Sequence, residues 1–173
     1  MAVFPIRYWG DPVLRREAFE VEAVDGPVRK LIRDLRETMA AAPGVGLAAP
    51  QIGVSKRVIV WRYEEDDGVL VNPKVVEHGG REEGEEACLS VPGLAYPVVR
   101  AEWVRVEGLG ESGDELVVSA SGWTARILQH EIDHTNGVLF IDRLSPELQR
   151  EARRRLREQA LGETPPVEPA SIL

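Results

Sequence analysis

Apolar residues recur at helical spacing near the N-terminus, and charged residues occupy the positions between them. Asp25-Gly26-Pro27 precedes this stretch and is typical of a helix start, with Asp25 as the cap. The apolar positions are three or four residues apart, namely Val28, Leu31, Ile32, Leu35 and Met39. This pattern predicts an amphipathic helix over about 26–42.

Beyond that helix the pattern changes to short runs rich in β-branched and aromatic residues, which predict strands. The predicted strands cover 57–63, 69–77, 98–108 and 115–120. Pro73 interrupts the second of them. The acidic, glycine-containing segment 79–86 is expected to be an exposed loop, and Glu86 is the one residue in it that adjoins the candidate site described below.

Two further helices are predicted after the strands. The first begins at Ser121, its expected N-cap, and ends near Gly137, whereas the second begins at Ser145 and reaches about Leu161. One helix, then several strands, then helices indicate an α+β fold and not a regularly alternating parallel one. We therefore expect antiparallel or mixed sheets packed around a central helix, with an N-terminal and a C-terminal helix.

Length, charge and cysteine usage narrow the class of protein. The 173 residues are expected to form one domain, 1–161, followed by a mobile tail over 162–173. The net charge of −8 argues against broad nucleic-acid or anionic-membrane binding. No apolar run approaches the roughly 20 residues that span a bilayer, and the N-terminus lacks the pattern of a secretion signal. The single cysteine, Cys88, excludes an intrachain disulfide, so we expect a cytoplasmic protein.

The clearest chemical signal lies in the helix predicted after Ser121. His130 and His134 are two of the three histidines of the chain, and their spacing of four places both on one helix face. Two imidazoles so placed can share one metal ion, and Glu131 can reach a water on it. The alternative, a surface helix with two solvated histidines, leaves the glutamate between them unexplained.

A catalytic site of this kind typically has a third protein ligand and one open position. The candidates are Cys88, a carboxylate and His78. His78 lies in a polar His-Gly-Gly segment and is expected to be exposed. Cys88 lies between Ala87 and Leu89, and its thiolate would bind a divalent metal strongly.

The segment 44–53 is rich in glycine and alanine, so its backbone can bend sharply or approach another group closely. Its glycine spacing matches neither the dinucleotide-binding fingerprint nor the phosphate loop, which argues against nucleotide binding. A tight turn between helix and strand is the simplest interpretation. Gln51 adds a side-chain amide that can donate two hydrogen bonds.

Three separate segments together resemble the motifs of the peptide deformylase family. Gly44 to Gln51 is similar to G-x-G-L-A-A-x-Q, Glu86 to Ser90 to E-G-C-L-S, and Gln129 to His134 to Q-H-E-x-D-H. The order and approximate spacing also agree, over about residues 3–160. H-E-x-x-H alone is shared with many unrelated metalloproteases, whereas the three motifs together are specific.

The resemblance implies a deformylase that removes the formyl group from the initiator formyl-methionine of new polypeptides and releases formate. It implies one divalent metal ion held by Cys88, His130 and His134. Ferrous iron is the expected ion, and zinc or nickel can replace it. Glu131 would be the general base. The oxyanion donors would be the Gln51 amide and the Leu89 backbone N–H.

The resemblance also implies where substrate and partners bind. The predicted substrate-binding residues are Val45, Gly46, Glu86, Arg126 and Ile127. The expected partners are N-formylated nascent polypeptides and the ribosome surface, without sequence-specific nucleic-acid binding or membrane binding. A monomer is expected. Asp133 is predicted to face away from the metal and to pair with Arg100.

Two departures from the family pattern leave alternatives open. Ala87 stands where the family usually has glycine, and it would be strained if that position needs a positive φ. Thr135 replaces the usual apolar residue after the last motif. The alternatives are a deformylase paralogue with altered or lost activity, a zinc peptidase that uses H-E-x-x-H, and a non-catalytic metal-binding module.

Overall fold

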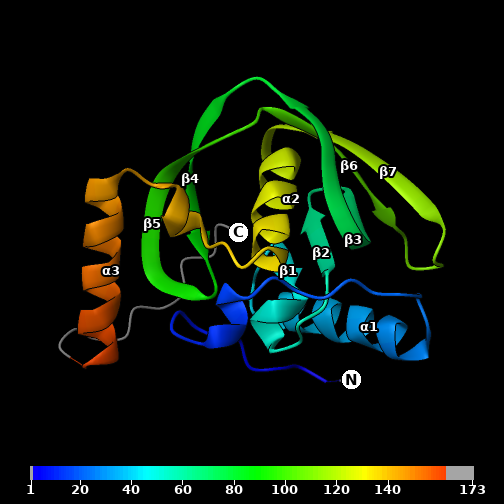
Figure 1. The fold of residues 1–173 in the computed structure, drawn as a ribbon, viewed down its shortest axis with the longest axis horizontal. Coiled ribbons are helices and arrows are strands. Elements are labelled where there is room, and N and C mark those ends of the chain that lie inside the picture. Colours follow the sequence, from blue (N-terminus) through cyan, green and yellow to red (C-terminus); the bar gives the residue numbers. More distant parts are fainter. Residues whose placement is uncertain (1, 163–173) are drawn as a thin grey trace.

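Figure 1 shows a central helix, α2 (Gly122–Thr135), between a strongly bent five-stranded sheet and a two-stranded hairpin. The computed structural model describes residues 2–162. Helix α1 (Gly26–Ala41) crosses below the sheet, and helix α3 (Pro146–Ala160) lies on the far side of the hairpin. Three short 3-10 helices connect these elements, namely η1 (Pro12–Arg15), η2 (Ala49–Ile52) and η3 (Phe140–Arg143).

Every neighbouring pair of strands is antiparallel, which confirms the α+β prediction. The five-stranded sheet has the order β1-β2-β3-β6-β7. Its strands are β1 (Gly46–Ala48), β2 (Val58–Tyr63), β3 (Asp66–Gly79), β6 (Trp103–Leu109) and β7 (Glu115–Ser121). The hairpin consists of β4 (Glu82–Cys88) and β5 (Val91–Arg100).

The exposed loop predicted over 79–86 is wrong, because most of it belongs to β4. Acidic residues have low strand propensity, but here the pairing partner decides the conformation. Glu83 and Glu85 lie opposite Val99 and Pro97 of β5 and keep their carboxylates exposed. The residues that alternate with them face the other side of the strand, and this set ends at Glu86, which is buried.

The single strand predicted over 98–108 is also wrong. It is divided at Ala101-Glu102 into the end of β5 and the start of β6. Strand β5 pairs with β4, whereas β6 pairs with β3, so the chain passes from one sheet to the other at this break. The apolar pattern alone could not show which partner each half would take.

Strand β3 is longer than the predicted 69–77, and Pro73 does not end it. The β3–β6 register shifts between Val71 and Lys74, so Pro73 lies in an irregular part of the ladder, where a missing N–H is tolerated. Asn72 adopts φ 53° there, and its side-chain amide exchanges two 2.8 Å hydrogen bonds with the backbone of Val21. The bulge thereby fixes the N-terminal segment against the sheet.

The helix predictions are confirmed apart from one cap. Asp25 caps α1 by accepting a hydrogen bond from the Val28 N–H (3.0 Å). Ser145 caps α3 in the same way through the Leu148 N–H (3.4 Å). Ser121 occupies the N-cap position of α2, but its side chain makes no capping hydrogen bond.

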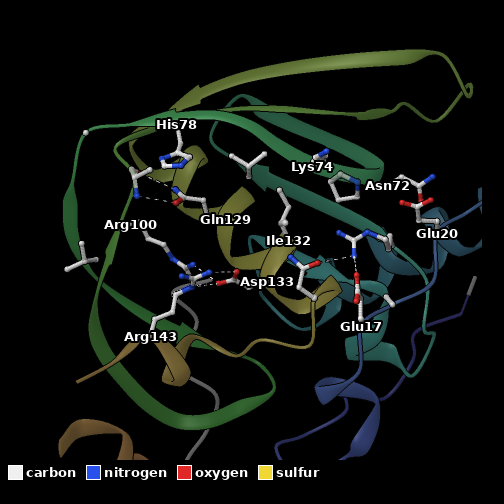
Figure 2. Close-up of a pocket in the computed structure, with 18 of the residues that line it drawn as sticks. Glu17, Glu20, Asn72, Lys74, His78, Arg100, Gln129, Ile132, Asp133 and Arg143 are labelled. Carbon is white, nitrogen blue, oxygen red and sulfur yellow. Dashed lines mark hydrogen bonds and ion pairs between the residues drawn. The ribbon is translucent and has the colours of Figure 1, made fainter. Parts of the chain in front are cut away.

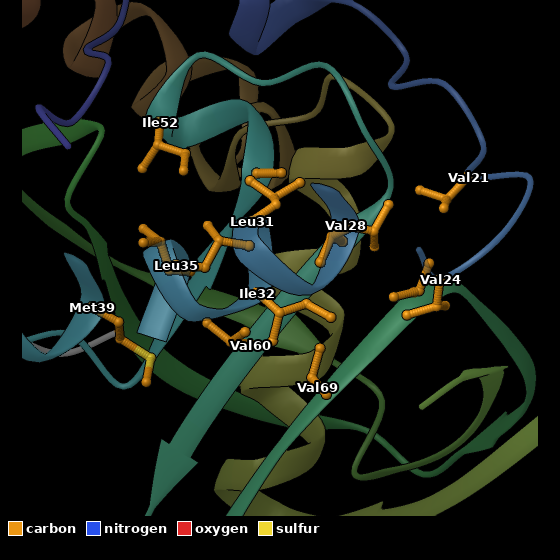
Figure 3. Packing of buried hydrophobic residues seen from close by; sticks show 14 of the residues in the cluster. Val21, Val24, Val28, Leu31, Ile32, Leu35, Met39, Ile52, Val60 and Val69 are labelled. Atoms are coloured by element: carbon orange, nitrogen blue, oxygen red, sulfur yellow. The ribbon is translucent and has the colours of Figure 1, made fainter. Parts of the chain in front are cut away.

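Strand β2 is buried on both faces over Val58 to Trp61, which explains why this part of the strand is continuously apolar. On one face α1 packs Ile32 and Leu35 against Val60 and Val69, as Figure 3 shows. On the other face α2 packs against a second set of strand residues. The buried members of this second cluster are Ala48, Ile59, Trp61, Leu70, Val104, Val106, Ala125, Ile127, Leu128 and Ile132. Helix α2 is therefore an interior helix, and its polar residues are held in fixed positions.

A third cluster joins the hairpin to the C-terminal part of the chain. It packs Leu94 and Val98 of β5 against Phe140 of η3 and Leu156 of α3, with Cys88 at its edge. The predicted tail, 162–173, lies outside the described residues from 163 onward. Among residues 2–162, no helix is both long and apolar enough to cross a membrane.

Candidate metal centre and active site

The structure brings the three predicted metal ligands together. One ligand atom each from Cys88, His130 and His134 lies within 4.8 Å of the other two. The Cys88 Sγ is 3.3 Å from Nε2 of His134, and the two imidazole rings meet edge to face with centroids 5.0 Å apart. All three side chains are buried. His78, the alternative third ligand, is exposed on β3 and lies outside this cluster.

Two elements position these ligands. The two histidines are one turn apart on α2, and the cysteine is the last residue of β4. The β4–β5 register shifts between Ala87 and Cys88, so that Cys88 pairs with Val91 across a tight turn. Ala87 itself has no positive φ, and therefore the strain expected of alanine at this position does not arise.

Glu86 is fully buried. It lies behind the candidate metal-binding residues Cys88, His130 and His134, which together are called the metal cluster. Its Oε2 is 3.0 Å from Nδ1 of His130, and its Oε1 accepts hydrogen bonds from Arg100 Nε and Arg126 Nη1, each at 2.8 Å. Burial by itself would raise the pKa of Glu86, but hydrogen bonds from Arg100 and His130 outweigh burial and hold the pKa far below its usual range. The carboxylate is therefore ionised, and it leaves Nε2 as the free nitrogen of His130.

Glu86 and Arg126 were expected beside the substrate, but the structure places both inside the protein. The Arg126 guanidinium also donates to the carbonyl oxygens of Val98 (2.9 Å) and Glu82 (3.1 Å). Gly84 gives this side chain room, because a Cβ at this position would lie 3.0 Å from the guanidinium carbon of Arg126. Both residues thus support the metal cluster from behind.

The predicted pair between Asp133 and Arg100 is confirmed, with Nη1 to Oδ2 at 2.6 Å. Arg143 of η3 also donates to both oxygens of Asp133, including Nη2 to Oδ1 at 2.6 Å. Arg143 could not be predicted as a partner from the sequence, because no local pattern connects it to Asp133, ten residues earlier on α2. Arg100 therefore joins two carboxylates of different elements, Glu86 on β4 and Asp133 on α2.

Glu131 projects from the same turn of α2 as His130 and lies against the backbone of β1. A Cβ on Gly46 would be 2.5 Å from its Oε1, so only glycine leaves room for this carboxylate. Its Oε2 is buried and has no hydrogen-bond partner among residues 2–162. Burial raises the pKa of Glu131 to about 7. Such a group can gain and lose a proton near neutral pH.

Gln51, in η2, has an orientation fixed by the backbone. Its Oε1 accepts a hydrogen bond from the Ala48 N–H (2.8 Å), which turns the amide nitrogen toward the metal cluster. That nitrogen lies 3.7 Å from Cys88 Sγ and 3.3 Å from Ser90 Oγ. The amide therefore presents donors beside the cysteine ligand.

The remaining predicted site residues surround this centre. Leu89 follows the cysteine, and a Cβ on Gly44 would lie 3.1 Å from its side chain. Ile127 is fully buried in the cluster between α2 and the sheet, and Val45 is partly buried against that cluster. Val45 and Gly46 lie at the free edge of the sheet, because β1 is its terminal strand and pairs with β2.

The donor set fits one divalent metal ion. Two imidazoles and a thiolate are ligands that zinc and related first-row metals prefer. Burial lowers the pKa of His134 well below its ordinary value, which favours the neutral, metal-binding form. The carboxylate of Glu131, which has no partner at Oε2 within the described part of the chain, is not a member of this group of three candidate ligands.

Comparisons with known proteins agree with this arrangement. Residues 3–150 match the family described as polypeptide deformylase. The peptide deformylase of Acidothermus cellulolyticus is 52% identical over 158 residues, which cover 91% of this chain and 88% of that protein. A crystal structure of a Legionella pneumophila peptide deformylase is 46% identical, with a TM-score of 0.87, and the match covers 95% of this chain and all of that one. The Ehrlichia chaffeensis enzyme in complex with actinonin is 38% identical, with a TM-score of 0.88 over 92% of this chain and 98% of that one. This chain belongs to the polypeptide deformylase family.

Proposed function

We propose that this protein is a metal-dependent hydrolase that removes the formyl group from the N-terminal formyl-methionine of newly made polypeptides and releases formate. Family membership supports the reaction class. The observation that carries the proposal is the position of Glu131, buried beside the Cys88, His130 and His134 cluster and directly against β1. A site that merely stored metal would not need such a carboxylate.

The cluster of Cys88, His130 and His134 would hold one divalent ion, and we propose ferrous iron, with zinc or nickel able to replace it. When bound, the ion supplies Lewis-acid polarisation and a water of lowered pKa. Glu86 contributes by orienting His130 through the contact at Nδ1 (3.0 Å). That contact also favours the tautomer with Nε2 free.

Glu131 is the proposed general base and acid. It takes a proton from the attacking water and delivers that proton to the amine nitrogen that leaves as the formyl carbon–nitrogen bond breaks. Its pKa of about 7, raised by burial, suits both transfers. Its closeness to Gly46 keeps the carboxylate at the edge of β1, where an extended peptide can approach.

The oxyanion that forms on the formyl group needs donors aimed at it. We assign this role to the side-chain amide of Gln51 and the backbone N–H of Leu89. Gln51 is supported by the hydrogen bond at its Oε1, which turns the amide nitrogen to within 3.7 Å of Cys88 Sγ. A preorganised donor of this kind contributes about 3 kcal/mol to transition-state stabilisation.

The substrate peptide is proposed to add to the free edge of β1 as a further strand. Val45 and Gly46 would provide the backbone contacts, and Gly44 and Gly46 would allow a close approach. Val45 and Ile127 would line the pocket for the methionine side chain. Glu86 and Arg126 would act indirectly, by positioning His130 and the hairpin, since both side chains are buried.

A contact with the ribosome surface would bring the enzyme to its substrate, and we place that contact on α3. This helix contains five arginines and three glutamates, in a chain whose net charge is −8. The buried residues of α3 are Ala152 and Leu156, and the arginines lie on the rest of the helix surface. A monomeric, cytoplasmic enzyme fits this role. Cosedimentation with ribosomes that is lost in an Arg154→Glu, Arg157→Glu variant would support the contact, and unchanged cosedimentation would contradict it.

The decisive experiment is formate release from a formyl-Met tripeptide by protein purified anaerobically, with its metal content assayed. Glu131→Ala should retain the metal and lose at least 100-fold in kcat. Metal bound without turnover would instead favour a paralogue with another acylated substrate. Cleavage of internal bonds in an unformylated peptide would favour the zinc peptidase alternative.

A further inference from the structure

Arg143 of η3 binds a carboxylate that does not belong to the metal cluster. Its Nε and Nη2 both donate to Asp133, and the distance from Nη2 to Oδ1 is 2.6 Å. Arg100 donates to the same carboxylate, with Nη1 to Oδ2 at 2.6 Å, and Figure 2 shows both guanidinium groups directed at it. Asp133 is buried, whereas the side chain of Arg143 is 43% exposed and borders a cavity of about 920 Å³. The two arginines thus share one buried carboxylate.

Arg100 holds a second buried carboxylate, that of Glu86. Its Nε and Nη2 donate to Oε1 and Oε2 of Glu86 at 2.8 and 2.9 Å. Oε2 of Glu86 is also the atom that lies 3.0 Å from Nδ1 of His130. The partner at Nδ1 orients the ring of a metal-binding histidine. The orientation of His130 therefore depends on where Arg100 lies between its two carboxylates.

Asp133 would draw Arg100 toward itself if Arg100 were its only partner. A buried carboxylate that loses one of its two guanidinium partners keeps an uncompensated charge, which is strongly unfavourable. Arg143 prevents this because its paired donors engage both oxygens of Asp133. Arg100 can then keep two of its three donor nitrogens on Glu86.

The 3-10 helix η3 is itself fixed in place, so that its arginine can serve as a support. Asp142 of η3 pairs with Arg15 of η1. The ring of Phe140, also in η3, stacks on the imidazole of His130, with centroids 6.1 Å apart and an angle of 27° between the planes. This short helix therefore contacts the metal cluster directly through Phe140 and indirectly through Arg143.

We propose that Arg143 is a positioning residue of the metal centre. By holding Asp133 it keeps Arg100 on Glu86, and Glu86 then keeps the His130 ring in the orientation that leaves Nε2 free for the metal. This role in ligand geometry does not depend on the reaction, and only its effect on kcat rests on the proposed deformylase activity.

The test compares Arg143→Gln with the unaltered protein, both with cobalt as the bound metal. The visible d–d absorption bands of cobalt(II) report ligand geometry, so they should change in wavelength or intensity when His130 is reoriented. Metal affinity, measured by competition with a chelator, should fall about tenfold. With a formyl-Met tripeptide kcat should also fall about tenfold while KM stays unchanged, because Arg143 acts through a metal ligand and not through peptide binding.

Arg105→Gln is the matched control, because the side chain of Arg105 is equally exposed (43%) and pairs with Glu77 on the neighbouring strand. It should leave the cobalt spectrum, the metal affinity and kcat unchanged. Arg143→Lys keeps the charge without the forked pair of donors, so its effects should be intermediate. This variant decides the question by the same measurements if Arg143→Gln does not fold.

A variant of Arg143 that is merely less stable to denaturant, with the cobalt spectrum and metal affinity of the unaltered protein, would overturn the proposal. An equal spectral change in Arg105→Gln would also overturn it. If the unaltered protein released no formate, the proposed function would fail, and the cobalt spectra would still decide the role of Arg143.

Discussion

Oε2 of Glu86 lies 3.0 Å from Nδ1 of His130, so a carboxylate from the hairpin sets the orientation of a predicted metal ligand on the central helix. The carboxylate is itself held by the buried guanidinium groups of Arg100 and Arg126. These four side chains come from β4, β5 and α2. Their contacts fix the hairpin, which carries Cys88, relative to the helix that carries the histidines.

Replacing Glu86 should therefore affect both stability and metal binding. Glu86→Gln leaves two buried arginines without a full counter-charge, and we expect the free energy of unfolding to fall by about 3 kcal/mol. Metal affinity should fall roughly 10- to 100-fold, because His130 loses the partner that orients it. Denaturant unfolding and metal titration measure the two effects. Glu85→Gln, on the adjacent exposed position of β4, should change neither, and a loss of equal size there would contradict the explanation.

Gly46 is predicted to be indispensable for activity because of its contact with Glu131. In Gly46→Ala the new Cβ would meet Oε1 of Glu131 at 2.5 Å, so the carboxylate or β1 must shift. A displacement of about 1 Å can cost 100-fold in rate, and we expect a loss of that order in kcat. Gly26→Ala is the control, because nothing lies within 4 Å of its Cβ position. Normal formate release by Gly46→Ala would show that Glu131 is not confined as described.

Arg100 and Arg105 provide a matched comparison of buried and exposed ion pairs. Arg100 binds both Glu86 and Asp133 with its side chain 2% exposed, whereas Arg105 pairs with Glu77 with its side chain 43% exposed. Lysine cannot reproduce the forked geometry, so Arg100→Lys should lower the free energy of unfolding by about 3 kcal/mol. Arg105→Lys should change it by less than about 1 kcal/mol. Thermal and denaturant unfolding of both variants, with their metal content, measure the difference, and equal effects would refute the network.

Metal removal should lower stability and expose the role of Cys88. At a free metal concentration 100 times the dissociation constant, binding to the folded chain adds about 2.7 kcal/mol to the free energy of unfolding. A chelator should therefore lower the unfolding midpoint. In the cobalt-substituted protein a thiolate-to-metal charge-transfer band is expected in the near ultraviolet, and Cys88→Ser should abolish it. A band that persists in Cys88→Ser would mean that the third ligand is another residue.

The helices could be predicted from the sequence because their signals are local. The spacing of apolar residues in α1, the caps Asp25 and Ser145, and the interval between His130 and His134 all lie within one or a few turns. The spacing of the two histidines predicted two of the metal ligands in the same way, whereas Cys88 was one of several candidates for the third until the family resemblance favoured it. The deformylase motifs then related these local signals to a known family, which the comparisons confirmed.

The strands around the site could not be predicted as well, because strand pairing depends on residues far away in the chain. The acidic segment 82–88 has the composition of a loop and becomes β4 because β5 pairs with it. The apolar run over 98–108 is divided between two sheets for the same reason. A pattern along one strand does not reveal its partner.

The sequence by itself thus determined the helices of this protein, and it predicted Cys88, His130 and His134 as metal ligands and Glu131 as general base. Only the tertiary structure decided that Glu86 and Arg126 are buried behind Cys88, His130 and His134, and that Arg143 completes the contacts of Asp133. The physical reason is that a buried charge must find its partners in three dimensions. These partners lie 10, 14 and 40 residues away along the chain, beyond the reach of any local pattern.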